Sequence, residues 1–270
     1  MYYGNEVDQS FSFFVFIYAK RNTMKRYILF FLVFFLFAFS TAATAGESLN
    51  AAVAANFMQP FKEIAKLFES KNQVSVNATF ASSGHLTGQI MNGAPYDIFL
   101  SADEERPVAL YTKGLAEKPF VYARGRVVLW SAKKELCGAS SWREIVKHSS
   151  VKRSAVASPK VAPYGAAAMA ALEQSRLRDT LQQKFIYPEN IAQAFQYAVT
   201  ESTDAAFCAL SSALSEQGRK GCYFEVTEAP PIVQGGCVLI RAKDKEAAKE
   251  FVNFLNSPEV NSIKGKYGYK

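Results

Sequence analysis

From residue 48 onward, short apolar runs alternate with segments in which apolar residues recur every three or four positions. The first short run, SLNAAVAA, predicts a buried strand. In the next segment, PFKEIAKLFESK, the residues Phe61, Ile64 and Phe68 share one helical face, with Lys and Glu on the opposite face. Strand and helix patterns continue to alternate along the chain. The alternation predicts an α/β protein whose helices cover a sheet rich in parallel strands.

The same reasoning places the other elements of the predicted fold. Further strands are predicted at 72–80, 94–103, 125–132, 154–159, 184–188, 204–213 and 233–242. Further helices are predicted at 85–93, 106–115, 140–148, 164–175, 190–202 and 245–260. No fixed-period repeat and no low-complexity segment interrupts this order.

The N-terminal region has the pattern of an export signal. Lys25 and Arg26 precede an unbroken apolar run over 27–39, and the small residues Ala-Thr-Ala follow at 43–45. This order is typical of a signal peptide with its cleavage site. The alternative is an uncleaved membrane anchor, but the apolar run is shorter than the roughly 20 residues that a spanning helix needs.

This pattern predicts where translation starts and where the chain is cleaved. Residues 1–23 precede the ordinary start of a signal peptide, and we expect Met24 to be the true start. The signal peptide would then cover 24–45, and the mature, exported chain would begin near Gly46. Which start codon is used is left open by the sequence.

The charge balance argues against one class of partner. The chain contains 31 Lys and Arg and 24 Asp and Glu, which gives a formal net charge of +7. The basic residues are spread over many predicted helices and form no dense cluster interleaved with aromatic residues. We therefore expect a solvated surface and no nucleic-acid partner.

The four cysteines do not have the spacing of a metal site. None belongs to a C-x-x-C pair, and the chain has only two histidines, so no zinc site can be assembled by spacing. In an oxidising compartment Cys222 and Cys237, which flank a Pro-rich segment, could form a disulfide. Four isolated buried thiols are the alternative.

Four predicted strand-to-helix junctions carry residues suited to holding an anion. In open α/β sheets, ligands bind beyond the carboxyl ends of strands, where helix N-termini converge. These junctions offer preferred N-cap residues, glycine, free N–H groups and the positive ends of helix dipoles. Each alone could be only a helix cap, but together they could form an oxyanion site. The junctions are 55–57, 82–84, 163–165 and 189–191.

One junction, in the segment FASSGHL, also raises the question of a serine hydrolase. Ser82 or Ser83 would need a base within hydrogen-bond reach, and His85 is the nearest candidate. Residues two apart point to different sides of a helix, and the segment lacks the G-x-S-x-G elbow. We therefore expect no enzyme activity. A purely structural exported protein is a third possibility, although it would not need four donor junctions.

Four longer segments carry a resemblance to a known family. VAANFMQPFKEIAKLFE, FASSGHLTGQIMNGAPYDIFLSADE, SPKVAPYGAAAMAALE and AAKEFVNFLNSPEVNSIKGKYGY resemble the periplasmic molybdate-binding proteins of ATP-driven importers. The resemblance extends over 47–269. It implies a two-lobed type II periplasmic-binding-protein fold, in which each lobe is a mixed sheet flanked by helices and the ligand lies in the cleft. Lobe I would comprise 46–125 plus 231–270, and lobe II would comprise 126–230.

The resemblance also implies how a ligand would be held. Neutral hydrogen-bond donors would bind molybdate or tungstate through its oxygens, with no direct bond between protein and metal and with no cofactor. Ser83 would donate both its N–H and its hydroxyl, whereas Tyr164 and Ile191 would donate backbone N–H groups. The implied binding residues are Asn56, Ser83, Tyr164 and Ile191, with Ala55 and Ser82 as further candidates.

One residue departs from the family pattern. Ala209 occupies a position at which many relatives have a donor tyrosine. This leaves the full set of donors and the order of molybdate, tungstate and sulfate affinity open. Another oxyanion such as sulfate or thiosulfate is the alternative ligand, whereas phosphate is disfavoured because it carries a proton and none of the expected donors is acidic. The implied partners are a membrane permease and an ATPase, and we expect a monomer.

Overall fold

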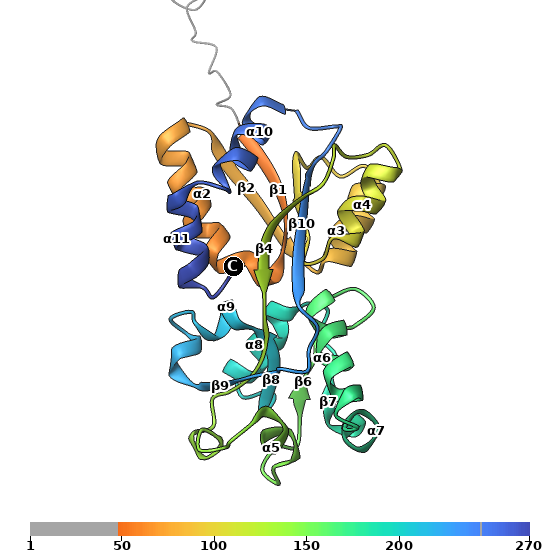
Figure 1. Cartoon of the computed structure of the whole chain (residues 1–270), viewed down its shortest axis with the longest axis vertical. Helices are drawn as coiled ribbons and strands as arrows, with labels where there is room; N and C mark the ends of the chain where they lie inside the picture. The colour runs from red at the N-terminus through yellow and green to blue at the C-terminus, as the bar shows by residue number, and fades with distance from the viewer. Residues whose placement is uncertain (1–47, 244) are drawn as a thin grey trace, which may run out of the picture. The chain divides into compact units, whose positions relative to one another are not determined.

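The computed structural model describes residues 48–243 and 245–270 (Figure 1). The predicted overhang at 1–23 and the predicted signal peptide at 24–45 lie outside these residues. Within the described part of the chain, no helix combines the length and the apolar character needed to cross a membrane.

The described residues form two five-stranded mixed sheets. The strands of the first sheet are β1 (Ser48–Ala54), β2 (Ser75–Ala81), β3 (Ile98–Leu100), β4 (Phe120–Gly125) and β10 (Ile232–Val238). Those of the second are β5 (Val127–Ser131), β6 (Ser154–Ala155), β7 (Phe185–Ile186), β8 (Ala205–Ala209) and β9 (Cys222–Glu225). Their orders are β2-β1-β3-β10-β4 and β7-β6-β8-β5-β9. In each sheet three adjacent strands are parallel, the fourth (β10 or β5) is antiparallel to both of its neighbours, and the edge strand beyond it (β4 or β9) again runs in the direction of the first three.

Helices flank both sheets, which confirms the predicted two-lobed fold class. The helices around the first sheet are α2 (Met58–Asn72), α3 (Ser83–Met91), α4 (Glu105–Thr112), α10 (Lys245–Phe254) and α11 (Pro258–Lys266). Those around the second are α5 (Trp142–Lys147), α6 (Pro163–Gln174), α7 (Arg178–Leu181), α8 (Ile191–Val199) and α9 (Leu210–Ala213). Short 3₁₀ turns are η1 (Ala55–Phe57), η2 (Lys134–Leu136), η3 (Gln182–Lys184) and η4 (Gly218–Lys220).

Strand β1 is buried on both faces. Ala51 and Val53 belong to a core shared with residues of α2 and α10, whereas Ala52 packs with Leu86 of α3 and Leu110 of α4. In Figure 1, α2, α10 and α11 lie on one side of this sheet, and α3 and α4 lie on the other. Burial on both faces explains why the sequence of β1 is almost continuously apolar.

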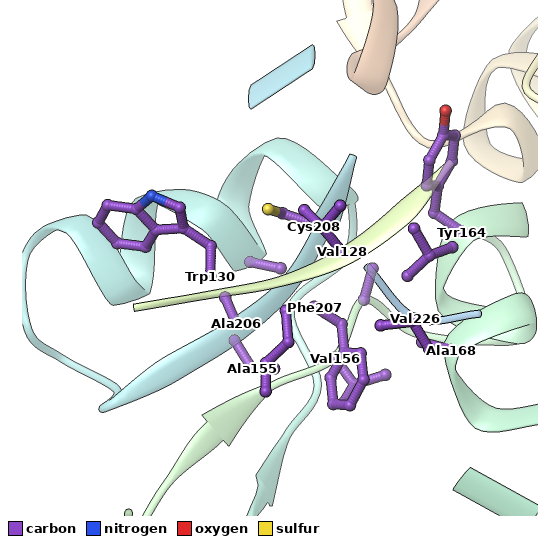
Figure 2. Close-up of a cluster of buried hydrophobic side chains, with 14 of the residues drawn as sticks. Val128, Trp130, Ala155, Val156, Tyr164, Ala168, Ala206, Phe207, Cys208 and Val226 are labelled. Carbon is purple, nitrogen blue, oxygen red and sulfur yellow. The ribbon is translucent and has the colours of Figure 1, made fainter. Parts of the chain in front are cut away.

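The second sheet has its own core (Figure 2). Trp130 of β5 contacts Phe195 of α8 edge to face, with ring centroids 5.0 Å apart. Trp142 of α5 contacts Phe207 of β8 in the same manner, at 5.8 Å. Such pairs add to the free energy gained from the burial of large apolar side chains.

The chain passes between the two sheets at two places. Strand β4 ends at Gly125 in the first sheet, and β5 begins at Val127 in the second; the return lies between Glu225 of β9 and Ile232 of β10. On this basis we propose lobe I as 46–125 plus 231–270 and lobe II as 126–230.

Some predicted elements differ from the structure. Strands β4 and β9 were not predicted. The predicted helix at 245–260 is two helices, because Pro258 lacks an N–H and suits the first turn of a new helix. Ser257 caps that helix by accepting from the N–H of Val260 at 3.3 Å. The predicted strand at 204–213 ends at Ala209, and α9 follows.

The cysteine pairing also differs from the prediction. A disulfide joins Cys137 to Cys222, with a Cα–Cα distance of 5.5 Å. The proposed Cys222–Cys237 bond is wrong, because Cys222 lies in the second sheet and Cys237 in the first. Cys208 and Cys237 are buried free thiols, and burial raises the pKa of Cys237 to about 12. The alternative of four isolated thiols is wrong as well. No cluster of potential metal ligands occurs among the described residues.

Candidate oxyanion-binding site

A small cavity brings together the beginnings of several helices from both lobes. The expected binding residues Asn56, Ser83, Tyr164 and Ile191 all line it, as do Ala55 and Ser82. The other lining residues are Ala54, Ala81, Ala102, Ala162, Pro163 and Asn190. None of these side chains is charged.

Sheet register explains why residues far apart in the sequence meet here. The parallel strands β1 and β2 pair Ala54 with Ala81, and β1 and β3 pair Val53 with Leu100. Their carboxyl ends therefore lie at one edge of the first sheet, and η1, α3 and Ala102 follow directly. Ala102 was not predicted, although its position just beyond a buried strand could have indicated it.

Ser83 lies in the first turn of α3 with its hydroxyl oxygen already engaged. Its Oγ accepts a hydrogen bond from the N–H of Ala102 at 2.9 Å, and only 1 % of the residue is exposed. With this lone pair occupied, the hydroxyl hydrogen remains available for donation. Ser82 is the N-cap of the same helix, and its Oγ accepts from the N–H of His85 at 3.4 Å.

Lobe II contributes the first turns of α6 and α8. Pro163 is the first residue of α6 and has no N–H, so the N–H of Tyr164 is the first donor of that helix. Asn190 caps α8 through its Oδ1, which accepts from the N–H of Gln193 at 3.0 Å and leaves the N–H of Ile191. First-turn N–H groups have no acceptor within their own helix. The two helices therefore present N–H groups and positive dipole ends to the cavity.

Asn56 lines the cavity, but its side-chain amide is hydrogen-bonded to residues that do not line it. Its Nδ2 donates to Oε1 of Gln234 at 2.7 Å and lies 3.1 Å from the hydroxyl of Tyr269. The backbone carbonyl oxygen of Asn56 accepts from the hydroxyls of Ser211 and Tyr269, both at 2.8 Å. Both amide hydrogens therefore have partners within the protein. The donor that Asn56 can offer to a ligand is its backbone N–H in η1.

A buried polar network lies beside the cavity and was not found from the sequence. Gln234 is fully buried in β10, and its Oε1 also lies 2.9 Å from the hydroxyl of Tyr122. Burial raises the pKa of Tyr122, Tyr164 and Tyr269, which keeps these hydroxyls neutral. A glutamine within the apolar run VQGGCVLI was the available signal, because a buried amide needs partners.

Tyr164 links the core of lobe II to this network. Figure 2 shows its hydroxyl directed away from the apolar cluster. A Cβ at Gly125 would lie 2.0 Å from that hydroxyl oxygen, so the close approach of Tyr164 requires glycine in β4. The hydroxyl lies 3.5 Å from Nε2 of Gln234.

Among the described residues, no hydrogen bond joins the ring of His85 to the hydroxyl of Ser82 or Ser83. The Nδ1 of His85 lies 4.0 Å from Oε2 of Glu189, and the two side chains are 45 % and 71 % exposed. A side-chain contact this exposed contributes little to stability. Ala209, the position that departs from the family pattern, is buried at the end of β8 and is not among the lining residues.

Comparison with known proteins places the chain in a family. Residues 49–270 match the family model described as bacterial extracellular solute-binding protein. The chain belongs to this family. The molybdate-binding protein ModA of Rhodobacter capsulatus is 37% identical over 229 residues, which cover 84% of this chain and 89% of that protein. ModA of Azotobacter vinelandii is 36% identical over 233 residues, covering 84% and 91%.

A solved structure gives the same result for the fold. The periplasmic molybdate-binding protein of Azotobacter vinelandii aligns with a TM-score of 0.78 and 29% sequence identity. The alignment covers 82% of this chain and 98% of that chain. These comparisons confirm the resemblance to molybdate-binding proteins that the sequence motifs indicated.

Proposed function

We propose that this protein binds molybdate, and also tungstate, in the periplasm and delivers it to the permease and ATPase of an ABC importer. The proposal includes export by cleavage of the predicted signal peptide, and action as a monomer without a cofactor. The observation that carries it is the convergence of helix first turns from both lobes on one small cavity without charged side chains. The family membership and the named relatives support it.

The chemistry of the cavity suits a fully ionised oxyanion. Helix N-termini supply N–H donors and partial positive charge, and the hydroxyl of Ser83 adds a side-chain donor. A protonated oxyanion such as phosphate would need an acceptor, and the lining contains no carboxylate.

The experiment is a titration of the protein purified after expression of the full 270-residue chain. Molybdate, tungstate, sulfate, thiosulfate and phosphate are compared by calorimetry and by thermal shift. A ligand at a hundredfold excess over its Kd should stabilise the fold by about 2.7 kcal/mol. We expect this effect for molybdate and tungstate, a far weaker one for sulfate and thiosulfate, and none for phosphate.

Two results would count against the proposal in different ways. Equal stabilisation by sulfate and molybdate would refute the specificity for molybdate and leave a general oxyanion-binding protein. No stabilisation by any of the five anions would refute the function itself. Mass spectrometry of the purified chain tests cleavage after Ala45, and light scattering tests the monomer.

A further inference from the structure

The two lobes contact each other directly through backbone atoms at the rim of the cavity. The N–H of Gly84, in the first turn of α3, donates to the carbonyl oxygen of Val161 at 2.9 Å. Val161 lies in the turn that precedes α6, in lobe II. The N–H of His85 in the same helical turn is bound to Ser82. Of these first-turn donors, the N–H of Ser83 is therefore left for a ligand, and that of Gly84 joins the lobes.

The close approach accounts for the glycine at this position. A Cβ on residue 84 would lie 2.9 Å from Cα, 3.0 Å from Cβ and 3.1 Å from the carbonyl oxygen of Val161. Backbone atoms cannot rotate away from such a contact as the end of a flexible side chain can. Gly84 has helical backbone, so no unusual dihedral angle requires glycine there. In the sequence this glycine belongs to a junction suited to holding an anion, but the group that approaches it is the backbone of the other lobe.

We propose that Gly84 determines oxyanion affinity by permitting full closure of the lobes, without touching the ligand. The inference rests on the proposed function of the cavity. The two partners of the hydrogen bond belong to different lobes, so opening of the cleft separates them. The apparent Kd of a ligand that needs the closed form rises as the closed fraction falls. A side chain at position 84 should therefore weaken binding through the closure equilibrium alone.

Two substitutions in the same helix separate this role from a general effect on the helix. Alanine is favoured over glycine inside helices. Gly84→Ala should therefore leave the Tm of the ligand-free protein unchanged or raise it by roughly 1–3 °C, while the Kd for molybdate rises at least about tenfold. The matched control is Gly88→Ala, because a Cβ built at that position has no atom within 4 Å apart from the adjoining residues and backbone of its own helix. It should raise the Tm similarly and keep the Kd within about twofold of the wild-type value.

The test measures calorimetric Kd values for molybdate and ligand-free Tm values for the wild type and both variants. The proposal is supported if Gly84→Ala keeps or raises the ligand-free Tm but weakens molybdate binding, while Gly88→Ala binds molybdate like the wild type. Wild-type affinity in Gly84→Ala would overturn it. A Gly84→Ala variant that loses ligand-free stability and affinity to the same extent would also overturn it, because the contact between Gly84 and Val161 would then persist whether or not a ligand is bound.

The wild-type titration tests the proposed function separately. If the wild type binds none of the oxyanions, that function fails, and small-angle scattering of the ligand-free proteins still decides the role of Gly84. A larger radius of gyration for Gly84→Ala than for Gly88→Ala would support control of closure. Equal radii in that situation would overturn it.

Discussion

Replacement of Ser83 by alanine would separate the two tasks that the structure gives to one hydroxyl. The Oγ accepts from the buried N–H of Ala102 at 2.9 Å, and its hydrogen is free for a ligand. In the ligand-free protein, loss of the acceptor leaves the N–H of Ala102 unpaired, which should lower the free energy of unfolding by about 1–3 kcal/mol. In the complex, loss of a hydrogen bond to an anionic oxygen costs about 1.5–3 kcal/mol more. The Kd for molybdate should therefore rise roughly ten- to a hundredfold.

The assay combines calorimetry for the Kd with urea denaturation of the ligand-free protein. Thr87→Val is the matched control, because it removes a buried hydroxyl that donates to the carbonyl oxygen of Ser83 at 2.7 Å but does not line the cavity. It should lower stability and leave the Kd within about threefold. If Ser83→Ala lowers stability and keeps the wild-type Kd, the hydroxyl is only a structural acceptor, and its assignment as a ligand donor is wrong.

Three further predictions concern the disulfide, a buried lysine and the rim histidine. Joint replacement of Cys137 and Cys222 by serine should lower the free energy of unfolding by about 2–5 kcal/mol, because their bond closes a loop of 85 residues; an unchanged urea midpoint would contradict this. Burial lowers the pKa of Lys264 to about 8 from its ordinary 10.5. Between about pH 8 and pH 10.5 this lysine therefore holds a proton in the unfolded chain and not in the folded protein. Its contribution to the free energy of unfolding consequently rises with pH over that interval. Relative to Lys264→Met, the wild type should gain up to about 3 kcal/mol between pH 7 and pH 11, and a constant difference in urea stability would refute this. His85→Ala should keep the Kd for molybdate within about fivefold by calorimetry, because the contact of His85 with Glu189 is largely exposed; abolished binding would show that the histidine belongs to the site.

Local sequence patterns determined the elements and the places where a ligand could be held. Apolar runs and helical periodicity predicted most strands and helices, because burial of one or both faces imposes those periods. Caps, prolines and glycines mark helix beginnings locally, so the four junctions could be found from the sequence. The family resemblance then singled out Asn56, Ser83, Tyr164 and Ile191 within them. All four line the cavity. The motif resemblance, confirmed by the comparisons, added the two-lobed arrangement.

The tertiary structure alone decided how these residues are used. Asn56 was expected among the binding residues, but Gln234 of β10 and Tyr269 near the C-terminus occupy both hydrogens of its side-chain amide. The partner of Cys222 was decided in the same way, because Cys237, the partner that the sequence suggested, lies in the other lobe. Gly84 likewise acquires its role only where Val161 approaches it. The physical reason is common to all three cases. Periodicity and capping reflect contacts between residues that are close along the chain. Hydrogen-bond partners and steric limits between lobes depend on the order of the strands and on where the chain crosses between lobes, and these leave no local sequence pattern.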